Sequence, residues 1–266
     1  WANMYDSFQK LAQQTRCKIP IIYGIDAVHG HNNVPGATIF PHNIGLGCTF
    51  NSDLVKKVSE VTAKEVAATG LNWNFAPCLT IPNDERWGRY YEGYSEDAEL
   101  VSKLGLAAIQ GYQNDLNKGH SIAACAKHFI GDGATIWGTG DNNYQIDRGN
   151  AIISNEELRE KHLIPYINAI DNGVLTVMAS FNSYNGLKCH ASSYLFNDLL
   201  KGELGFEGFV ISDWRGIDEI PGDYKSDIIT SINAGIDMVM VPGDVIWGGE
   251  PYEKFLKLFK ESVLEN

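Results

Sequence analysis

The feature that most constrains this chain is a repeated alternation between short apolar runs and amphipathic helical segments. Most of the runs are apolar throughout, as expected of parallel strands that are buried on both faces. Alternation of such strands with helices predicts a parallel sheet whose crossover connections are helical. Strands are expected at residues 19–25, 71–76, 121–126, 173–179, 205–211 and 235–241, with a weaker candidate at 43–48.

The segments between these runs carry helix start and stop signals. Ser154 and Glu157 form a capping box, and Pro251 suits the first turn of the last segment. Gly70 follows another segment as a stop signal. Helices are therefore expected at residues 53–69, 96–113, 154–170, 192–201, 226–234 and 251–264.

The number of strands limits the choice of fold. Six firm strands and one weak strand in 266 residues predict a (β/α)8 barrel of the TIM type, with a doubly wound open sheet as the alternative. An eighth strand is not visible, so the barrel is expected to be incomplete at its termini. No linker rich in Pro, Gly or Ser divides the chain, which predicts a single barrel domain over residues 1–266. The long irregular stretch at 131–150 has a length typical of functional or mobile loops.

Charge and cysteine usage restrict the partners of the chain. It has 21 Lys and Arg against 33 Asp and Glu, a net charge of −12 and a pI of about 5.0. Such a surface repels nucleic acids and anionic membranes, and no apolar run is long enough to span a bilayer. The five cysteines are widely spaced and contain no C-x-x-C, so neither a disulfide framework nor a zinc knuckle is expected.

Polar side chains gather where the predicted strands end. In a parallel barrel these ends form one rim, which carries the catalytic groups. The rim groups are carboxylates, cations and amides, and several have an aromatic neighbour. They are Asp26 and His29, residues 83–92, Lys127 and His128, residues 180–182, and residues 212–215.

This combination suits a sugar site. Hydroxyl groups pair with carboxylate acceptors and charged donors, and an indole such as that of Trp214 can stack on a pyranose face. Simpler interpretations stand beside it, because an Asp after a strand is often a helix cap and Trp87 is most simply a core residue. His29 and His31 suggest a metal, but no third ligand is placed, so neither a metal nor a cofactor is expected. The absence of a P-loop, a dinucleotide fingerprint and a G-x-S-x-G motif disfavours nucleotide, oxidoreductase and esterase chemistry.

Four motifs follow one another along the chain at residues 22–30 (IYGIDAVHG), 86–97 (RWGR with YSED), 127–129 (KHF) and 208–214 (GFVISDW). With these motifs the chain resembles the N-terminal barrel domain of glycoside hydrolase family 3, the family of β-glucosidases and β-glucan exohydrolases. The resemblance extends from Ile19 to about Pro242 and includes the motifs in the order of the family.

The resemblance implies a role for each rim residue. Asp213 matches the catalytic nucleophile, which forms a covalent glycosyl–enzyme in a retaining mechanism. Its carboxylate is expected to face an open hollow. The residues that match partners of the sugar hydroxyls are Asp26, Arg89, Lys127 and His128, and those that match further lining residues are Met178 and Trp214.

Two positions need comment. Arg89 is preferred to Arg86 because it stands in the Trp-Gly-Arg part of the motif. Phe181 departs from the family, in which many members carry a Tyr at this position. A hydrogen bond from that hydroxyl near the nucleophile is therefore not expected here.

The resemblance also indicates what lies outside the chain. In β-glucosidase members the general acid/base comes from a second domain after the barrel, so the chain is expected to be a fragment of a longer multidomain enzyme. The N-acetylglucosaminidases carry a histidine in the loop after the Lys-His strand. Residues 131–150 contain none, which favours the β-glucan exohydrolase-like branch.

The implied function is that of a retaining, exo-acting β-glucosidase on the terminal non-reducing β-D-glucosyl residues of oligosaccharides or β-glucans. The chain would supply the nucleophile and the glycone subsite, and alone it is expected to be poorly active. A sugar-binding barrel without hydrolytic activity is the alternative. Glucan-degrading members act outside the cytoplasm, so a secreted, periplasmic or lysosomal location is favoured.

Overall fold

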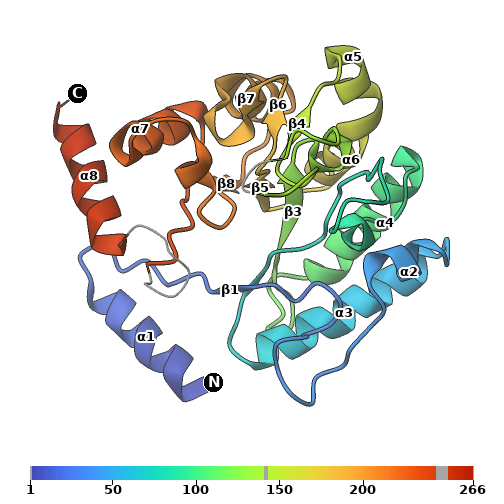
Figure 1. Cartoon of the computed structure of the whole chain (residues 1–266). Helices are drawn as coiled ribbons and strands as arrows, with labels where there is room; N and C mark the ends of the chain where they lie inside the picture. Colours follow the sequence, from blue (N-terminus) through green and yellow to red (C-terminus); the bar gives the residue numbers. More distant parts are fainter. Residues whose placement is uncertain (1, 141–142, 244–250, 266) are drawn as a thin grey trace.

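A computed structural model describes residues 2–140, 143–243 and 251–265. Its main sheet is parallel, with the strand order β1-β2-β3-β5-β8, and it curls into part of a barrel with helices on its outside (Figure 1). These strands are Gly24–Ile25 (β1), Trp73–Asn74 (β2), Ala123–Phe129 (β3), Thr176–Ala179 (β5) and Phe209–Ile211 (β8). A small second sheet contains Asn150–Ala151 (β4), Ser183–Tyr184 (β6) and Leu187–Lys188 (β7).

The helices alternate with the strands of the main sheet. The α-helices are Ala2–Gln14 (α1), Asn43–Gly47 (α2), Ser52–Ala68 (α3), Ala98–Tyr112 (α4), Asn155–Glu157 (α5), Ile164–Asp171 (α6), Tyr224–Ala234 (α7) and Tyr252–Glu265 (α8). Segments Leu158–His162 (η3) and Tyr194–Glu203 (η5) are π-helical. Short 3-10 helices cover Tyr90–Glu92 (η1), Asp132–Ala134 (η2), Cys189–Ala191 (η4) and Gly216–Glu219 (η6).

This arrangement confirms the predicted fold class, a TIM-type barrel that is incomplete. Five of the firm strand predictions overlap a strand of the main sheet, although β1 and β2 are much shorter than predicted and β3 continues beyond residue 126 to Phe129. The sixth, at 235–241, contributes a single parallel bridge from Met238 to Ile211. The segment expected as one helix at 154–170 is divided among α5, η3 and α6.

The weak strand expected at 43–48 is wrong, because this segment forms the short helix α2. The carbonyl of His42 accepts hydrogen bonds from the amides of Gly45 and Leu46, which closes a helical turn. Ile44 and Leu46 lie two positions apart, which matches the period of a strand but covers too few residues to test the period of a helix. So short a pattern could not decide between them.

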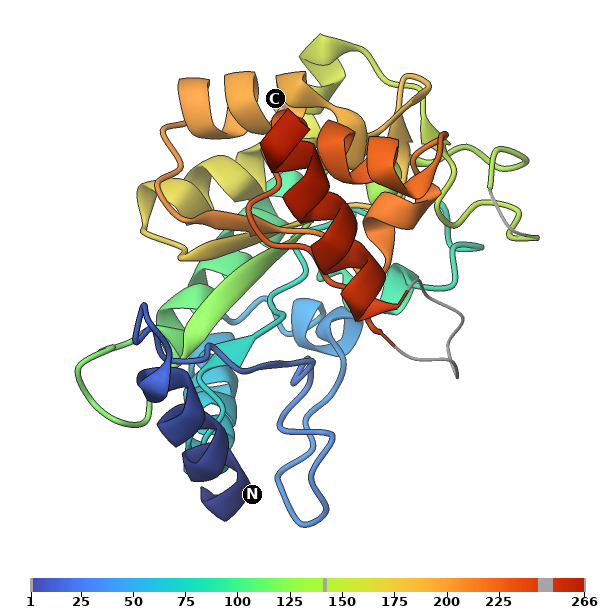
Figure 2. The same ribbon diagram turned by 90° about the vertical axis from the view of Figure 1, so that its left-hand side faces the viewer.

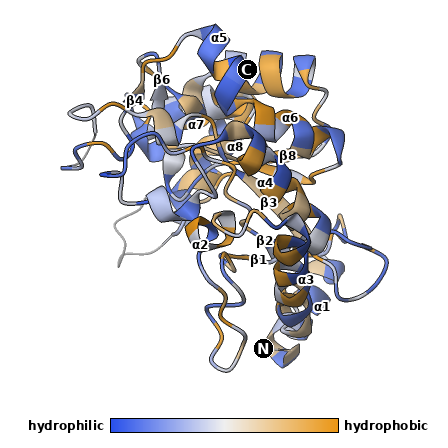
Figure 3. Cartoon of the chain, turned by 90° about the vertical axis from the view of Figure 1, so that its right-hand side faces the viewer, coloured by the Kyte–Doolittle hydropathy of each residue, from blue (hydrophilic) through white to orange (hydrophobic). Residues whose placement is uncertain are grey.

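The core lies on both faces of the sheet. Every residue of β3 is buried, as predicted for a central parallel strand. Its even-numbered residues Ala124 and Ala126 pack in the large cluster shared with the outer helices, whereas Ala123 and Cys125 belong to a small inner cluster. Hydrophobic segments accordingly gather around β2, β3 and α4 (Figure 3).

Two local features complete the frame. Gly24 in β1 lies so close to the inner aromatic residues that a Cβ there would come within 2.4 Å of the Phe75 ring. At the other end of the chain, α8 packs against α7 through Phe255 and Phe259 (Figure 2). Among the described residues, no helix has the length and apolar character needed to cross a bilayer.

Candidate functional site at the carboxyl end of the sheet

The loops that follow the parallel strands bring several predicted rim residues into one cluster. Arg89 Nη2 lies 2.8 Å from Nε2 of His128, and the same Nε2 lies 3.6 Å from Oδ2 of Asp213. These side chains come from the loops or ends of β2, β3 and β8, because the carboxyl ends of parallel strands meet at one edge. The structure therefore brings together Asp213, Arg89 and His128.

His128 is oriented by a carboxylate that the sequence analysis did not single out. Its Nδ1 lies 2.8 Å from Oδ2 of Asp132, and Asp132 Oδ1 accepts hydrogen bonds from Thr80 and the amide of Gly133. Burial and the charge of Arg89 lower the pKa of His128, but interactions with Asp132 and Cys78 outweigh them and raise it. The carboxylate of Asp132 therefore fixes the orientation of the His128 ring through its Nδ1 atom.

Arg89 is held in a second direction by Glu92 of η1. Two guanidinium nitrogens, Nε and Nη2, donate to the two carboxylate oxygens at 2.8 and 3.0 Å. Burial raises the pKa of Glu92, but the hydrogen bond and charge of Arg89 outweigh it and lower the pKa to about 2. The guanidinium is therefore fixed as a cation that points at His128.

Lys127 and Asp26 form a second pair beside this cluster. Lys127 Nζ lies 3.1 Å from Oδ1 of Asp26, and the two side chains are 5% and 62% exposed. Burial lowers the pKa of Lys127, but the charges of Asp26 and Glu92 outweigh it and raise the pKa. The ammonium is thus buried and charged, while its carboxylate partner faces solvent.

Asp213 is the second residue after β8, with its carboxylate turned toward the cluster. Oδ1 accepts the backbone N–H of Trp214 at 2.6 Å, whereas Oδ2 has no hydrogen-bond partner among the described residues. The side chain is 12% exposed, so it is less open than expected from the sequence. A buried carboxylate oxygen without a donor is rare in proteins and is typical of functional sites.

The remaining predicted residues occupy different surroundings. Trp214 is 46% exposed, next to Asp213, and can present its ring to a ligand. Met178 is buried in the inner apolar cluster with Trp73, Cys125 and Ile211, so no polar contact ties it to the charged groups. Phe181 lies beneath the guanidinium of Arg148, whose Cζ is 4.0 Å from the ring centroid. A Phe therefore has a packing partner at this position.

His190 is a further residue that the sequence analysis missed. It is fully buried, and its Nε2 accepts the backbone N–H of Asp213 at 3.1 Å. Burial lowers the pKa of His190 to about 4, so its Nε2 keeps a lone pair at neutral pH. The sequence does contain one indication of it. The dipeptide Asn185-Gly186 favours a tight hairpin turn, which returns the residues that follow it, His190 included, toward the rim.

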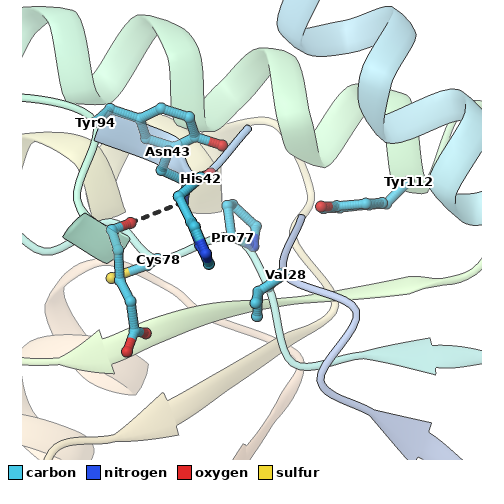
Figure 4. Close-up of a pocket in the computed structure, with 9 residues that line it drawn as sticks. Val28, His42, Asn43, Pro77, Cys78, Tyr94 and Tyr112 are labelled. Atoms are coloured by element: carbon cyan, nitrogen blue, oxygen red, sulfur yellow. Dashed lines mark hydrogen bonds between the residues drawn. The ribbon is translucent and has the colours of Figure 1, made fainter. Parts of the chain in front are cut away.

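A small enclosed cavity lies behind Glu92, between α2 and α4 (Figure 4). Asn43 closes it by donating from its side chain to the carbonyl of Glu92 at 2.7 Å. With a volume of about 10 Å³ it has room for one water molecule and none for a sugar. Within the described ranges, no group of three or more His, Cys, Asp or Glu residues is placed to hold a metal ion.

Comparisons with known proteins place this geometry in a family. The family model described as "Glycosyl hydrolase family 3 N terminal domain" matches residues 2–263. The chain is 36% identical to a lysosomal beta glucosidase of Dictyostelium discoideum, a match that covers 92% of this chain and 31% of the relative. It is 33% identical to a periplasmic beta-glucosidase of Salmonella typhimurium, over 91% of this chain and 30% of the relative.

A solved structure agrees with these relatives. The exo-1,3/1,4-beta-glucanase of a Pseudoalteromonas species superposes with a TM-score of 0.87 at 42% identity, and the match covers all of this chain and 33% of the other. The chain thus spans about a third of the length of the proteins it matches. Together with the family match over almost its whole length, these similarities establish that the chain belongs to glycosyl hydrolase family 3 and corresponds to its N-terminal domain.

Proposed function

We propose that the protein carrying this chain is a retaining, exo-acting β-glucosidase, and that this chain supplies the nucleophile and the subsite for the terminal sugar. One observation carries the proposal. Oδ2 of Asp213 has no hydrogen-bond partner within the described part of the chain, although it is buried beside His128 and near Arg89. An oxygen with free lone pairs in a positively charged setting is suited to attack an anomeric carbon.

In the proposed reaction an Asp213 oxygen forms a bond to the anomeric carbon as the bond to the leaving oxygen breaks. A general acid protonates that leaving oxygen, and the same group then activates water to release the sugar with retention. Retention requires the two carboxyl groups to lie about 5–5.5 Å apart. The charged pairs at the rim would hold the hydroxyls of the sugar, and Trp214 would line the same subsite; Met178 is assigned to that lining by the resemblance alone.

We also propose that residues 1–266 form a single barrel domain of a longer multidomain protein, and that a second domain supplies the general acid. The lengths of the relatives support this, since the chain spans about a third of each. The names of two relatives, one lysosomal and one periplasmic, favour a location outside the cytoplasm for this protein as well.

The test is to trap the glycosyl–enzyme. The protein expressed from its complete gene is incubated with an activated 2-deoxy-2-fluoro-β-glucoside, whose dinitrophenolate leaves without the help of an acid. Mass spectrometry should then find the fluoro-sugar on the peptide that contains Asp213. Asp213→Asn should abolish labelling, because an amide oxygen is a poor nucleophile at this carbon.

A matched control is Asp53→Asn, which makes the same chemical change at an exposed position in the first turn of α3 and should label like the wild type. Labelling of another residue, or undiminished turnover by Asp213→Asn, would refute the assignment of the nucleophile. If the wild type binds glucose but neither becomes labelled nor hydrolyses a β-glucoside, the non-catalytic sugar-binding barrel is the correct function.

A further inference from the structure

Two buried polar residues at the rim have no part in the proposed chemistry. They are Lys188, at the end of the β6–β7 hairpin, and His190, two residues later. Their exposed fractions are 8% and 0%. Burial of a cation and an imidazole is costly unless each has specific partners, so the partners indicate why these residues are here.

His190 holds the beginning of the turn that carries the proposed nucleophile. Its Nε2 accepts the N–H of Asp213 at 3.1 Å, and the next amide along the chain, that of Trp214, binds the Asp213 carboxylate. The imidazole also packs closely against Gly216, where an added Cβ would lie 2.2 Å from Nε2 of His190. The ring therefore contacts the turn at two points, and only a glycine fits at the second.

Lys188 holds the end of the same turn. Its Nζ lies 3.2 Å from Oε2 of Glu219, the last residue of η6, and also donates to the carbonyl of Phe181 at 3.1 Å. The other carboxylate oxygen of Glu219 accepts from Arg148, the residue whose guanidinium covers the Phe181 ring. This ion-pair network joins the hairpin, the loop at 143–149 and the turn at 213–219.

We propose that the β6–β7 hairpin is a clamp that sets the position of the nucleophile, with His190 and Lys188 as positioning residues that fix the two ends of the 213–219 turn. The inference rests on the proposed function of Asp213. Its physical basis is that an attacking oxygen must lie within a narrow range of distance and direction, and a displacement of about 1 Å can lower a rate about 100-fold. Neither residue needs to touch the sugar.

The decisive pair of variants is His190→Gln and His190→Met. A Gln side chain can place its Oε1 near the position of Nε2 and accept the Asp213 amide, whereas Met has a similar volume but no comparable acceptor. In the protein expressed from its complete gene, the maximal rate of labelling by the fluoro-glucoside should fall about 30-fold in His190→Met. Its half-saturating concentration should stay within about 3-fold of the wild type, because the hydroxyl partners are untouched. His190→Gln should recover most of the lost rate.

A second readout does not depend on catalysis. Hydrogen exchange measured by mass spectrometry should show that the Asp213 amide is protected in the wild type. In His190→Met this amide should exchange faster, while exchange of the amides of β3 should be the same as in the wild type. Lys188→Met should give a smaller loss of labelling rate, about 5-fold, with the faster exchange shifted to residues 216–219. It serves as the second variant if His190→Met does not fold.

The outcomes separate the two ideas. Equal labelling rates in His190→Met and His190→Gln, or a change confined to the half-saturating concentration, would overturn the clamp. So would an Asp213 amide that exchanges equally fast in the wild type and His190→Met. A different result would refute the proposed function alone. If the wild type is not labelled, but the Asp213 amide is protected in the wild type and exchanges faster in His190→Met, then Asp213 is not the nucleophile and the hairpin still holds the 213–219 turn.

Discussion

Two successive residues of β3, Lys127 and His128, each pair with a carboxylate, but the two pairs are built differently. The carboxylate of Asp132 beside His128 is 9% exposed and has donors on both oxygens, whereas that of Asp26 beside Lys127 is 62% exposed. A sealed pair behaves as part of the framework, because its partners cannot be exchanged for water. An open pair can exchange its partner for a ligand. The rim therefore combines a fixed half near Asp213 with an accessible half near Asp26.

The largest expected effect tests the sealed half. Asp132→Asn leaves the buried imidazole of His128 without its carboxylate, and breaking a buried charged pair typically costs about 3 kcal/mol or more. We expect the free energy of unfolding to fall by about that amount in a urea titration, with Asp53→Asn as the surface control. A loss near zero would mean that the pair is not part of the framework.

Glu92→Gln should have the next largest effect. The change removes one charge from a partly buried bidentate pair with Arg89, whose side chain is 28% exposed, and should cost about 2 kcal/mol of stability. Glu99→Gln, an exposed change in the first turn of α4, is the control and should cost a few tenths of a kcal/mol. Equal losses in the two variants would show that Arg89 does not depend on Glu92.

A second buried histidine, His162, provides a contrast with His128. Burial lowers the pKa of His162 to about 4, and its Nε2 has no hydrogen-bond partner among the described residues. Between pH 6.5 and about 4 the unfolded chain binds a proton at this residue that the folded chain excludes, so stability is lost as the pH falls. His162→Gln should reduce that slope by up to about 1.4 kcal/mol per pH unit.

The measurement is a series of urea titrations between about pH 4 and 7, which spans the folded and unfolded pKa of this histidine. His120→Gln changes an exposed histidine and should leave the slope as in the wild type. If His162→Gln also leaves the slope unchanged, His162 is protonated in the folded protein and the effect of burial is smaller than its surroundings indicate.

The smallest effect on stability is expected in the open half. Asp26→Asn should cost about 1 kcal/mol, because solvent screens the exposed carboxylate and the Asn oxygen can still accept from the buried ammonium of Lys127. The same change should raise the half-saturating concentration of the fluoro-glucoside about 10-fold, because a charged acceptor for hydroxyls is lost. A stability loss as large as that of Asp132→Asn would remove the distinction between the two halves.

Much of this layout could be predicted from the sequence, because it depends on strands that meet at one edge. The apolar runs indicated which segments form the sheet. Lys127 and His128 lie in the buried strand β3, and Asp213 follows β8 by two residues. Asp132 and His190 could not be found in this way. Asp132 contacts His128 from the turn after β3, and the contact of His190 with Asp213 joins residues 23 positions apart that are separated by η5 and β8.

The errors have a similar origin. The segment at 43–48 has too few apolar residues for a period to be assigned, and its helix depends on contacts with η1, such as that of Asn43 with Glu92. The exposure of Asp213 was also overestimated, since the sequence places a residue after a strand but does not specify how far its side chain turns inward.

Gly24 gives the open half an unexpected sensitivity. Since a methyl group at this position would collide with the rings of Phe75 and Trp73, any other residue would tilt the short strand away from its aromatic support. Asp26 is only two positions further on, so the tilt would carry its carboxylate away from Lys127. A substitution of Gly24 is therefore a way to alter binding at the proposed sugar subsite without changing any polar group.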